Sequence, residues 1–176
     1  ERGENEGEEE PHVIVAGFGR VGRRIVRLLT TAGLPCVAVD RNPDKVRAGR
    51  AESLQVVFGD ASRADVLRTV GADRARLVLV TLDSPEATER LIGAMRTQYP
   101  DLSIYARARD SEACEELVGL GADGVVSENL EASLQLARVA LDICGADTSQ
   151  REQLLDAFRS DYYQCRPPVL ARPAED

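Results

Sequence analysis

The most constraining feature of the sequence is a glycine pattern that directly follows a short apolar run. Residues 12–18 read HVIVAGF, and residues 17–22 read GFGRVG, which has the spacing GxGxxG. In this pattern the first glycine permits a tight turn, the second lets a phosphate approach the backbone, and the third lets the next helix pack closely on the strand. The helix also offers free N–H groups at its N-terminus. The pattern therefore predicts a buried strand, a phosphate-binding turn and a helix.

An acidic residue follows the glycine pattern at the distance that an adenine nucleotide site requires. Asp40 lies 18 residues after Gly22, at the end of a second apolar run. A carboxylate at this place accepts hydrogen bonds from both ribose hydroxyls and repels a 2′-phosphate. The two features together predict an adenine nucleotide such as AMP or NAD, in preference to NADP. Arg41 beside it either stacks on the adenine or is simply solvated.

Short apolar runs alternate with helical patterns along the rest of the chain. Ser62 is expected to cap one of these helices, which runs to Val70. The alternation predicts an α/β fold, a Rossmann-type doubly wound parallel sheet of about six strands with a short helical C-terminal segment. The strands are expected at residues 12–18, 36–39, 55–58, 76–82, 103–108 and 125–126.

Length and charge set the expected domain organisation. The 176 residues allow one α/β domain with a small appendage, and the net charge of −8 is concentrated in the Glu-rich start of the chain. Because the rest is nearly neutral, a nucleic-acid partner is not expected. We expect an acidic linker at residues 1–11, a nucleotide-binding domain at 12–146, a helical extension at 147–165 and a tail at 166–176.

Polar residues also follow the third and fourth expected strands. Asp60 and Ala61 follow one strand, and Thr81 and Leu82 follow the other. The carboxyl ends of parallel strands meet at one edge of the sheet, where open sheets bind ligands. Asp60 either accepts a hydrogen bond from the adenine amino group or is a turn residue before the next helix.

Two arginines close the fifth expected strand. Arg107 and Arg109 are two residues apart, so strand alternation places them on the same face near the expected anion site. They either contact phosphate, or one of them pairs with Asp110 or Asp83.

The residues that an enzyme needs are not evident. His12 opens the first strand at the end opposite the glycine loop, and Lys45 lies on the expected helix after the second strand. With one histidine and four scattered cysteines, no metal site is expected either. The prediction is a binding module that is not an enzyme and has no catalytic residues. The alternative is a fragment of an NAD-dependent oxidoreductase that lacks its catalytic region.

From residue 12 to about residue 146 the sequence resembles the RCK, or TrkA-N, nucleotide-binding domains of potassium transport proteins. Within that family it is most similar to the cytosolic domain of monovalent cation:proton antiporters of the glutathione-regulated potassium efflux type. The stretches that carry the resemblance are VIVAGFGRVGRRIVRLL, VAVDRNPDKV, VVFGDASRADVL, TQYPDLSIYARARD and GADGVVSENLEASLQLA.

The resemblance implies a dimeric cytosolic module at the cytoplasmic face of the inner membrane. Such a module binds AMP, NAD or NADH and gates a potassium/proton antiporter attached at its N-terminus. Carried onto this chain, the implied nucleotide contacts are Gly17, Phe18, Gly19, Arg20, Val21, Asp40, Arg41, Asp60, Ala61, Thr81 and Leu82, with Arg107 as a further candidate.

Control by glutathione is not implied to the same degree. The pocket of the glutathione-gated members uses an aromatic residue near the end of the second helix, where this chain has Ala51, Glu52 and Ser53. Their late asparagine is also not evident, since Asp161 or Tyr162 stands in that region. The resemblance therefore supports nucleotide control and leaves glutathione in doubt.

Two apolar stripes near the C-terminus predict a homodimer. Leu154, Leu155 and Phe158 form one of them. A single small sheet has limited room to cover both stripes, and an uncovered apolar patch marks an interface. If both helices fold back on their own sheet, the chain is a monomer instead. The other stripe consists of Leu130, Leu134, Ala137 and Leu141.

Overall fold

A computed structural model of the chain describes residues 12–163. Within this range six parallel strands form one sheet in the order β3-β2-β1-β4-β5-β6. This order reverses direction between β1 and β4, as in doubly wound Rossmann-type sheets. The predicted fold class is confirmed. The strands are β1 (Val13–Ala16), β2 (Cys36–Asp40), β3 (Val56–Phe58), β4 (Leu77–Val80), β5 (Ser103–Ala108) and β6 (Gly124–Ser127).

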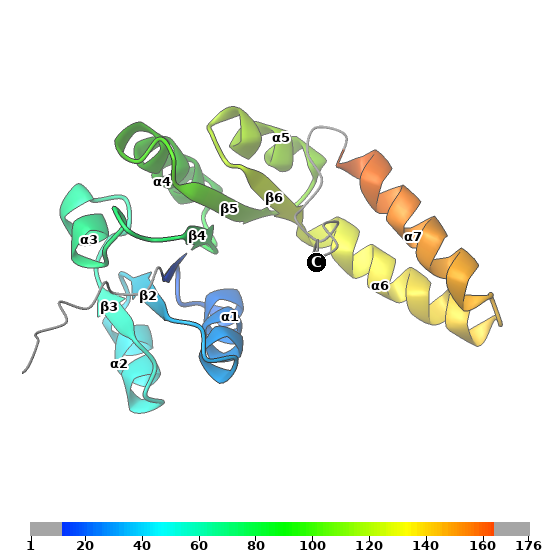
Figure 1. Cartoon of the computed structure of the whole chain (residues 1–176), viewed down its shortest axis with the longest axis horizontal. Helices are drawn as coiled ribbons and strands as arrows, with labels where there is room; N and C mark the ends of the chain where they lie inside the picture. Colours follow the sequence, from blue (N-terminus) through cyan, green and yellow to red (C-terminus); the bar gives the residue numbers. More distant parts are fainter. Residues whose placement is uncertain (1–11, 164–176) are drawn as a thin grey trace, which may run out of the picture.

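The helices cover both faces of the sheet and divide its core into two parts (Figure 1). Along β1, Val15 packs with residues of α1 and α2, whereas Ile14 and Ala16 pack with residues of α3, α4 and α5. The apolar run in the sequence is thus a strand buried on both sides, as predicted. The helices are α1 (Arg20–Thr31), α2 (Pro43–Ala51), α3 (Ala64–Thr69), α4 (Pro85–Gln98), α5 (Ser111–Gly119), α6 (Glu128–Ile143) and α7 (Thr148–Tyr162).

Most of these helices start at a residue whose side chain accepts hydrogen bonds from the first turn. Helices α1 and α3 are the exceptions among the described helices: Gly19 and Arg63 stand at their N-cap positions, without a side-chain cap. The expectation that Ser62 caps α3 is wrong, because its hydroxyl donates to Asp60 instead. The capping residues of the others are Asn42, Ser84, Asp110, Ser127 and Asp147.

Helices α6 and α7 form an antiparallel hairpin that extends away from the sheet (Figure 1). Arg159 of α7 pairs with Glu131 of α6, and Arg138 of α6 pairs with Glu152 of α7. The end of α7 returns to the sheet edge, where the backbone N–H of Ser127 donates to the Tyr163 hydroxyl at 2.9 Å. The hairpin is therefore anchored at its base and free of the sheet along most of its length.

No helix within residues 12–163 is long and apolar enough to span a membrane. The predicted linker at residues 1–11, the tail at 166–176 and the last two residues of the predicted extension lie outside the described part of the chain.

Candidate functional site

A cleft of about 240 Å³ lies at the carboxyl edge of the sheet, between the loops that follow β1 and β4. We call it the glycine-loop cleft. The turn after β1 borders it, together with the ends of β2, β3 and β4 and the start of α4. Its lining residues are Gly17, Gly19, Val39, Asp40, Arg41, Lys45, Gly59, Asp60, Ala61, Ser62, Thr81, Leu82, Asp83, Ser84, Ala87 and Arg90.

The three glycines of the pattern differ in what the fold requires of them. Gly17 has a φ of +105°, a conformation that residues with a side chain rarely adopt. A Cβ atom at Gly22 would lie 2.0 Å from the carbonyl oxygen of Gly17, so the helix could not pack so closely. At Gly19 a Cβ atom would meet nothing closer than 3.5 Å. The fold therefore requires the first and third glycines but not the second. The space beside Gly19, which we call the notch, is open to the cleft.

The open notch coincides with the uncapped N-terminus of α1. Gly19 is the N-cap residue of this 12-residue helix, and no side chain bonds its first turn. The free N–H groups and the positive end of the helix dipole both favour an anion. An uncapped helix N-terminus of this kind can accept a phosphate.

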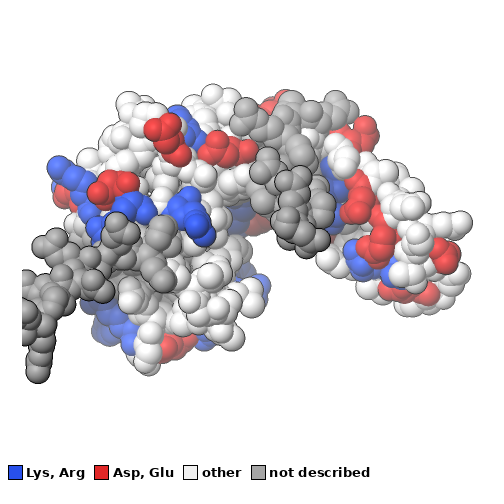
Figure 2. All heavy atoms as spheres, viewed as in Figure 1, with Lys and Arg blue, Asp and Glu red and all other residues white. Residues whose placement is uncertain are grey.

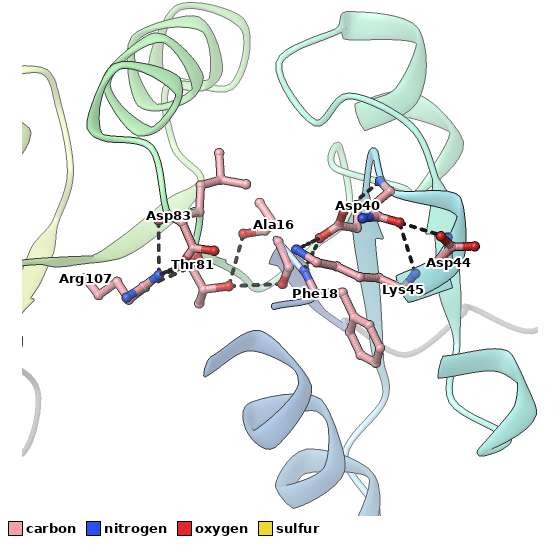
Figure 3. A network of polar contacts seen from close by, with 11 residues as sticks. Ala16, Phe18, Asp40, Asp44, Lys45, Thr81, Asp83 and Arg107 are labelled. Atoms are coloured by element: carbon pink, nitrogen blue, oxygen red, sulfur yellow. Dashed lines mark hydrogen bonds and ion pairs between the residues drawn. The ribbon is translucent and has the colours of Figure 1, made fainter. Parts of the chain in front are cut away.

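Asp40 is bound to the glycine loop itself. Its carboxylate accepts the backbone N–H of Phe18 at 2.7 Å and that of Asn42 at 2.8 Å, and its Oδ2 lies 3.6 Å from Nζ of Lys45 (Figure 3). The side chain of Asp40 is only 11% exposed. Because a carboxylate has about four lone-pair sites, these contacts fix its orientation and leave acceptor capacity toward the cleft.

Asp60 forms a turn at the other side of the cleft. One of its carboxylate oxygens accepts the backbone N–H of Ser62 at 2.9 Å and the Ser62 hydroxyl at 2.7 Å, and the other lies 3.7 Å from Arg41. The hydrogen bond from the Ser62 hydroxyl is the main cause that lowers the pKa of Asp60, and the positive charges of Arg41 and Arg90 add to it. Asp60 is thus an ionised turn residue, as one of the two interpretations expected, whose second oxygen faces cations.

Thr81 connects β4 to the glycine loop. Its buried hydroxyl lies 3.0 Å from the carbonyl oxygen of Gly17 and 3.2 Å from that of Ala16, and it donates to them (Figure 3). The backbone N–H of Thr81 also donates to Ala16 at 2.8 Å. The two loops that border the cleft are therefore held to each other by one residue.

Arg107 does not line the glycine-loop cleft. Its guanidinium donates to the carbonyl oxygens of Thr81 and Leu82 and forms ion pairs with Asp83 and Glu128. Of the two interpretations from the sequence, the ion pair with Asp83 is the one observed, and Asp110 instead caps α5.

Eight of the twelve predicted contact residues line the cleft and four do not. Phe18 is buried beneath the loop and contributes only its backbone N–H, while Arg20, Val21 and Arg107 lie outside the lining. The eight that the structure brings together are Gly17, Gly19, Asp40, Arg41, Asp60, Ala61, Thr81 and Leu82.

Sequence reasoning missed two basic residues of the cleft. Lys45 lies in the first turn of α2, and Arg90 lies in the second turn of α4. A helix that follows a strand in a parallel sheet starts at the carboxyl edge, so its first turns face the ligand side. Basic residues in the first turns of α2 and α4 were therefore the available signal.

A second cavity of about 450 Å³ adjoins the cleft and shares Leu82 and Asp83 with it. It lies between α4, β5 and α5. Arg107 and Arg109 line it together with four acidic residues, Asp83, Glu89, Glu116 and Glu128. Its acidic excess makes it a poorer place for an anion than the notch at Gly19.

The strand order, the glycine loop and the uncapped α1 helix define the chain as a Rossmann-type domain. The family profile of the TrkA-N domain matches residues 13–128. The chain belongs to the TrkA-N family, as the resemblance predicted.

Relatives of known name are potassium efflux proteins. The chain is 40% identical over 149 residues to K(+) efflux antiporter 2, chloroplastic, of Arabidopsis thaliana, with 85% of this chain and 13% of that protein covered. It is 34% identical over 169 residues to the glutathione-regulated potassium-efflux system protein KefC of Klebsiella pneumoniae, with 96% of this chain and 27% of that protein covered. The chain thus spans about an eighth to a quarter of the length of these relatives.

Two solved structures share the fold and carry nucleotides. The Shewanella denitrificans Kef CTD in AMP bound form has a TM-score of 0.74 at 29% identity, covering 87% of this chain and 94% of that chain. The GsuK channel bound to NAD has a TM-score of 0.60 at 29% identity, covering 89% of this chain and 25% of that chain. The predicted ligands, AMP and NAD, are those of these structural relatives.

Proposed function

We propose that the chain is the regulatory domain of a potassium/proton antiporter and that its glycine-loop cleft binds an adenine nucleotide. The observation that carries the proposal is the open notch at Gly19. The fold does not require a glycine at this position, and the notch lies at the uncapped N-terminus of α1. The phosphate of AMP or NAD occupies the notch, and Asp40 accepts the ribose hydroxyls. The AMP-bound and NAD-bound relatives support both ligands.

Occupancy of the cleft biases an antiporter domain attached at the N-terminus, at the cytoplasmic face of the inner membrane. The domain itself catalyses no reaction. His12 supports this view, because it lies at the opposite edge of the sheet, where its Nε2 is 2.7 Å from the carbonyl oxygen of Val70. Glutathione is not part of the proposal. Glu52, which pairs with Arg23 and Arg27, lies near the end of the second helix, where the pocket of the glutathione-gated members uses an aromatic residue.

The domain acts as a homodimer through α6. The stripe expected to be uncovered turns partly inward, with Leu134 buried, whereas Leu136, Val139 and Ile143 are 73%, 54% and 81% exposed. Their spacing places them on one face of the helix, and a second copy related by a two-fold axis would cover it. In Figure 2 the positive and negative side chains of the hairpin lie next to one another among uncharged surface. This agrees with the ion pairs that join α6 to α7, Arg138 with Glu152 and Arg159 with Glu131.

Calorimetry with AMP, NADH and NADPH tests the proposed ligand class. Binding of AMP and NADH, with NADPH weaker, is the expected result, because Asp40 repels a 2′-phosphate. If none of the three binds at millimolar concentration, the cleft is not a nucleotide site and the proposal fails.

A further inference from the structure

Lys45 is the only lysine in a chain that has 22 basic Lys and Arg residues, and it stands at the rim of the glycine-loop cleft. It lies in the first turn of α2, which Asn42 caps by accepting the N–H groups of Asp44 and Lys45. The cap and Pro43 fix where the helix begins, so they also fix the direction in which the Lys45 side chain leaves the backbone.

The ammonium group of Lys45 reaches back over the glycine loop (Figure 3). Its Nζ lies 3.6 Å from Oδ2 of Asp40 and 3.8 Å from the position that a Cβ atom would take at Gly19. The cation is therefore next to the one place in the glycine pattern that the fold leaves open.

The other charges around the notch are already compensated. Oδ2 of Asp83 would lie 3.5 Å from a Cβ at Gly19, but this carboxylate is paired with Arg107. Arg41 and Arg90, which also line the cleft, act on Asp60 at its far side. Among the described basic residues that line the cleft, Lys45 is the one that faces the notch.

Asp40 does not depend on Lys45 for its orientation. Two backbone N–H groups hold its carboxylate at 2.7 and 2.8 Å, whereas the ammonium is 3.6 Å away. An ammonium on a flexible four-carbon stem can move from this carboxylate to a phosphate without disturbing the loop. A phosphate in the notch would be an additional partner for Lys45, beyond the one it already has.

We propose that Lys45 is the cationic contact of the ligand's phosphate and that it sets the preference of the cleft for a nucleotide over the corresponding nucleoside. The inference rests on the proposed function, because it assigns a residue within the same site. It also assigns the phosphate to the Lys45 side of the notch, with the adenine toward Asp60 and its two arginines.

Comparison of AMP with adenosine separates this role from its alternative, in which Lys45 only holds Asp40. For Lys45→Gln we expect AMP affinity to fall by at least about tenfold, the usual effect of a lost charge-assisted contact, while adenosine affinity stays within about twofold. Lys45→Arg keeps the charge and should retain more AMP affinity than Lys45→Gln. Arg47→Gln, two residues further along α2 on an exposed side chain paired with Asp44, is the matched control and should change neither affinity.

Amine labelling of the wild-type chain gives a second readout, because Lys45 is the only side-chain amine. AMP should protect Lys45 from acylation by an N-hydroxysuccinimide ester, and adenosine should protect it less, with the N-terminal amine as the internal reference. Equal losses of AMP and adenosine affinity in Lys45→Gln, or an unchanged AMP affinity, would overturn the proposal. Failure of wild type to bind either ligand would instead refute the proposed function itself.

Discussion

Replacing Gly19 with alanine should separate ligand binding from folding. The backbone at Gly19 has φ −79° and ψ −161°, which alanine adopts without strain. The new Cβ would lie 3.5 Å from Asp83 and 3.8 Å from Lys45, which are ordinary van der Waals distances. Alanine also lowers the entropy of the unfolded chain, which offsets its poorer N-cap propensity. We therefore expect the free energy of unfolding to change by less than about 1 kcal/mol.

The same methyl group should weaken AMP, because it occupies the notch where the phosphate approaches the N–H groups of α1. Loss of charge-assisted hydrogen bonds to the phosphate costs about 2 to 3 kcal/mol, or about 30- to 150-fold in the dissociation constant. Adenosine, which lacks the phosphate, should be affected much less. Isothermal titration calorimetry with both ligands measures the difference.

Gly22→Ala is the matched control for folding. Its Cβ would lie 2.0 Å from the carbonyl oxygen of Gly17, and a backbone atom cannot rotate away as a flexible side chain can. Such overpacking costs about 3 kcal/mol, which lowers the melting temperature by about 6 to 12 °C for a domain of this size. Wild-type AMP affinity in Gly19→Ala would refute the reasoning, since the phosphate would then not approach the backbone at this residue.

Three further outcomes follow from other contacts. Arg107→Ala should weaken AMP by about 1 kcal/mol, or about fivefold, because it leaves the charge of Asp83 uncompensated beside the notch; calorimetry checks this against Arg109→Ala. Ser62→Ala should raise the pKa of Asp60 toward its ordinary value, as followed by NMR titration of the carboxyl carbon. Because Ser62 holds this pKa down in the folded state, the variant should lose stability above about pH 4 relative to wild type, and the difference should vanish as the pH falls. Leu136→Glu should convert a dimer to a monomer in light scattering, whereas Leu28→Glu, an equally exposed leucine on α1, should not.

The sequence predicted the sheet and the position of the site well because both depend on local patterns. Apolar runs identified all six strands, and the spacing from Gly22 to Asp40 placed the carboxylate at the edge where the structure has it. What the pattern could not supply was the inner hydrogen bonding of the loop. Asp40 accepts the backbone N–H of Phe18, a contact that depends on how two loops meet in space.

The misjudged stripe on α6 has a similar cause. The helix carries apolar residues on two faces, and spacing alone does not say which one α7 covers. The pairs between Glu131 and Arg159 and between Arg138 and Glu152 join α6 to α7, and Leu134 of α6 and Leu155 of α7 are buried. Matching opposite charges between the two expected helices would have been a usable signal.

Arg107 shows why a residue outside the cleft still bears on it. Its guanidinium holds the carbonyl oxygens of Thr81 and Leu82, which line the cleft, and it also pairs with Glu128, the first residue of α6. Thr81 in turn donates to the carbonyl oxygen of Gly17. One side chain therefore connects the loop that borders the notch to the helix that carries the exposed stripe. A ligand that moves the end of β4 must either break the contacts of Arg107 with Thr81 and Leu82 or pull on its ion pair with Glu128, which lies at the base of the hairpin.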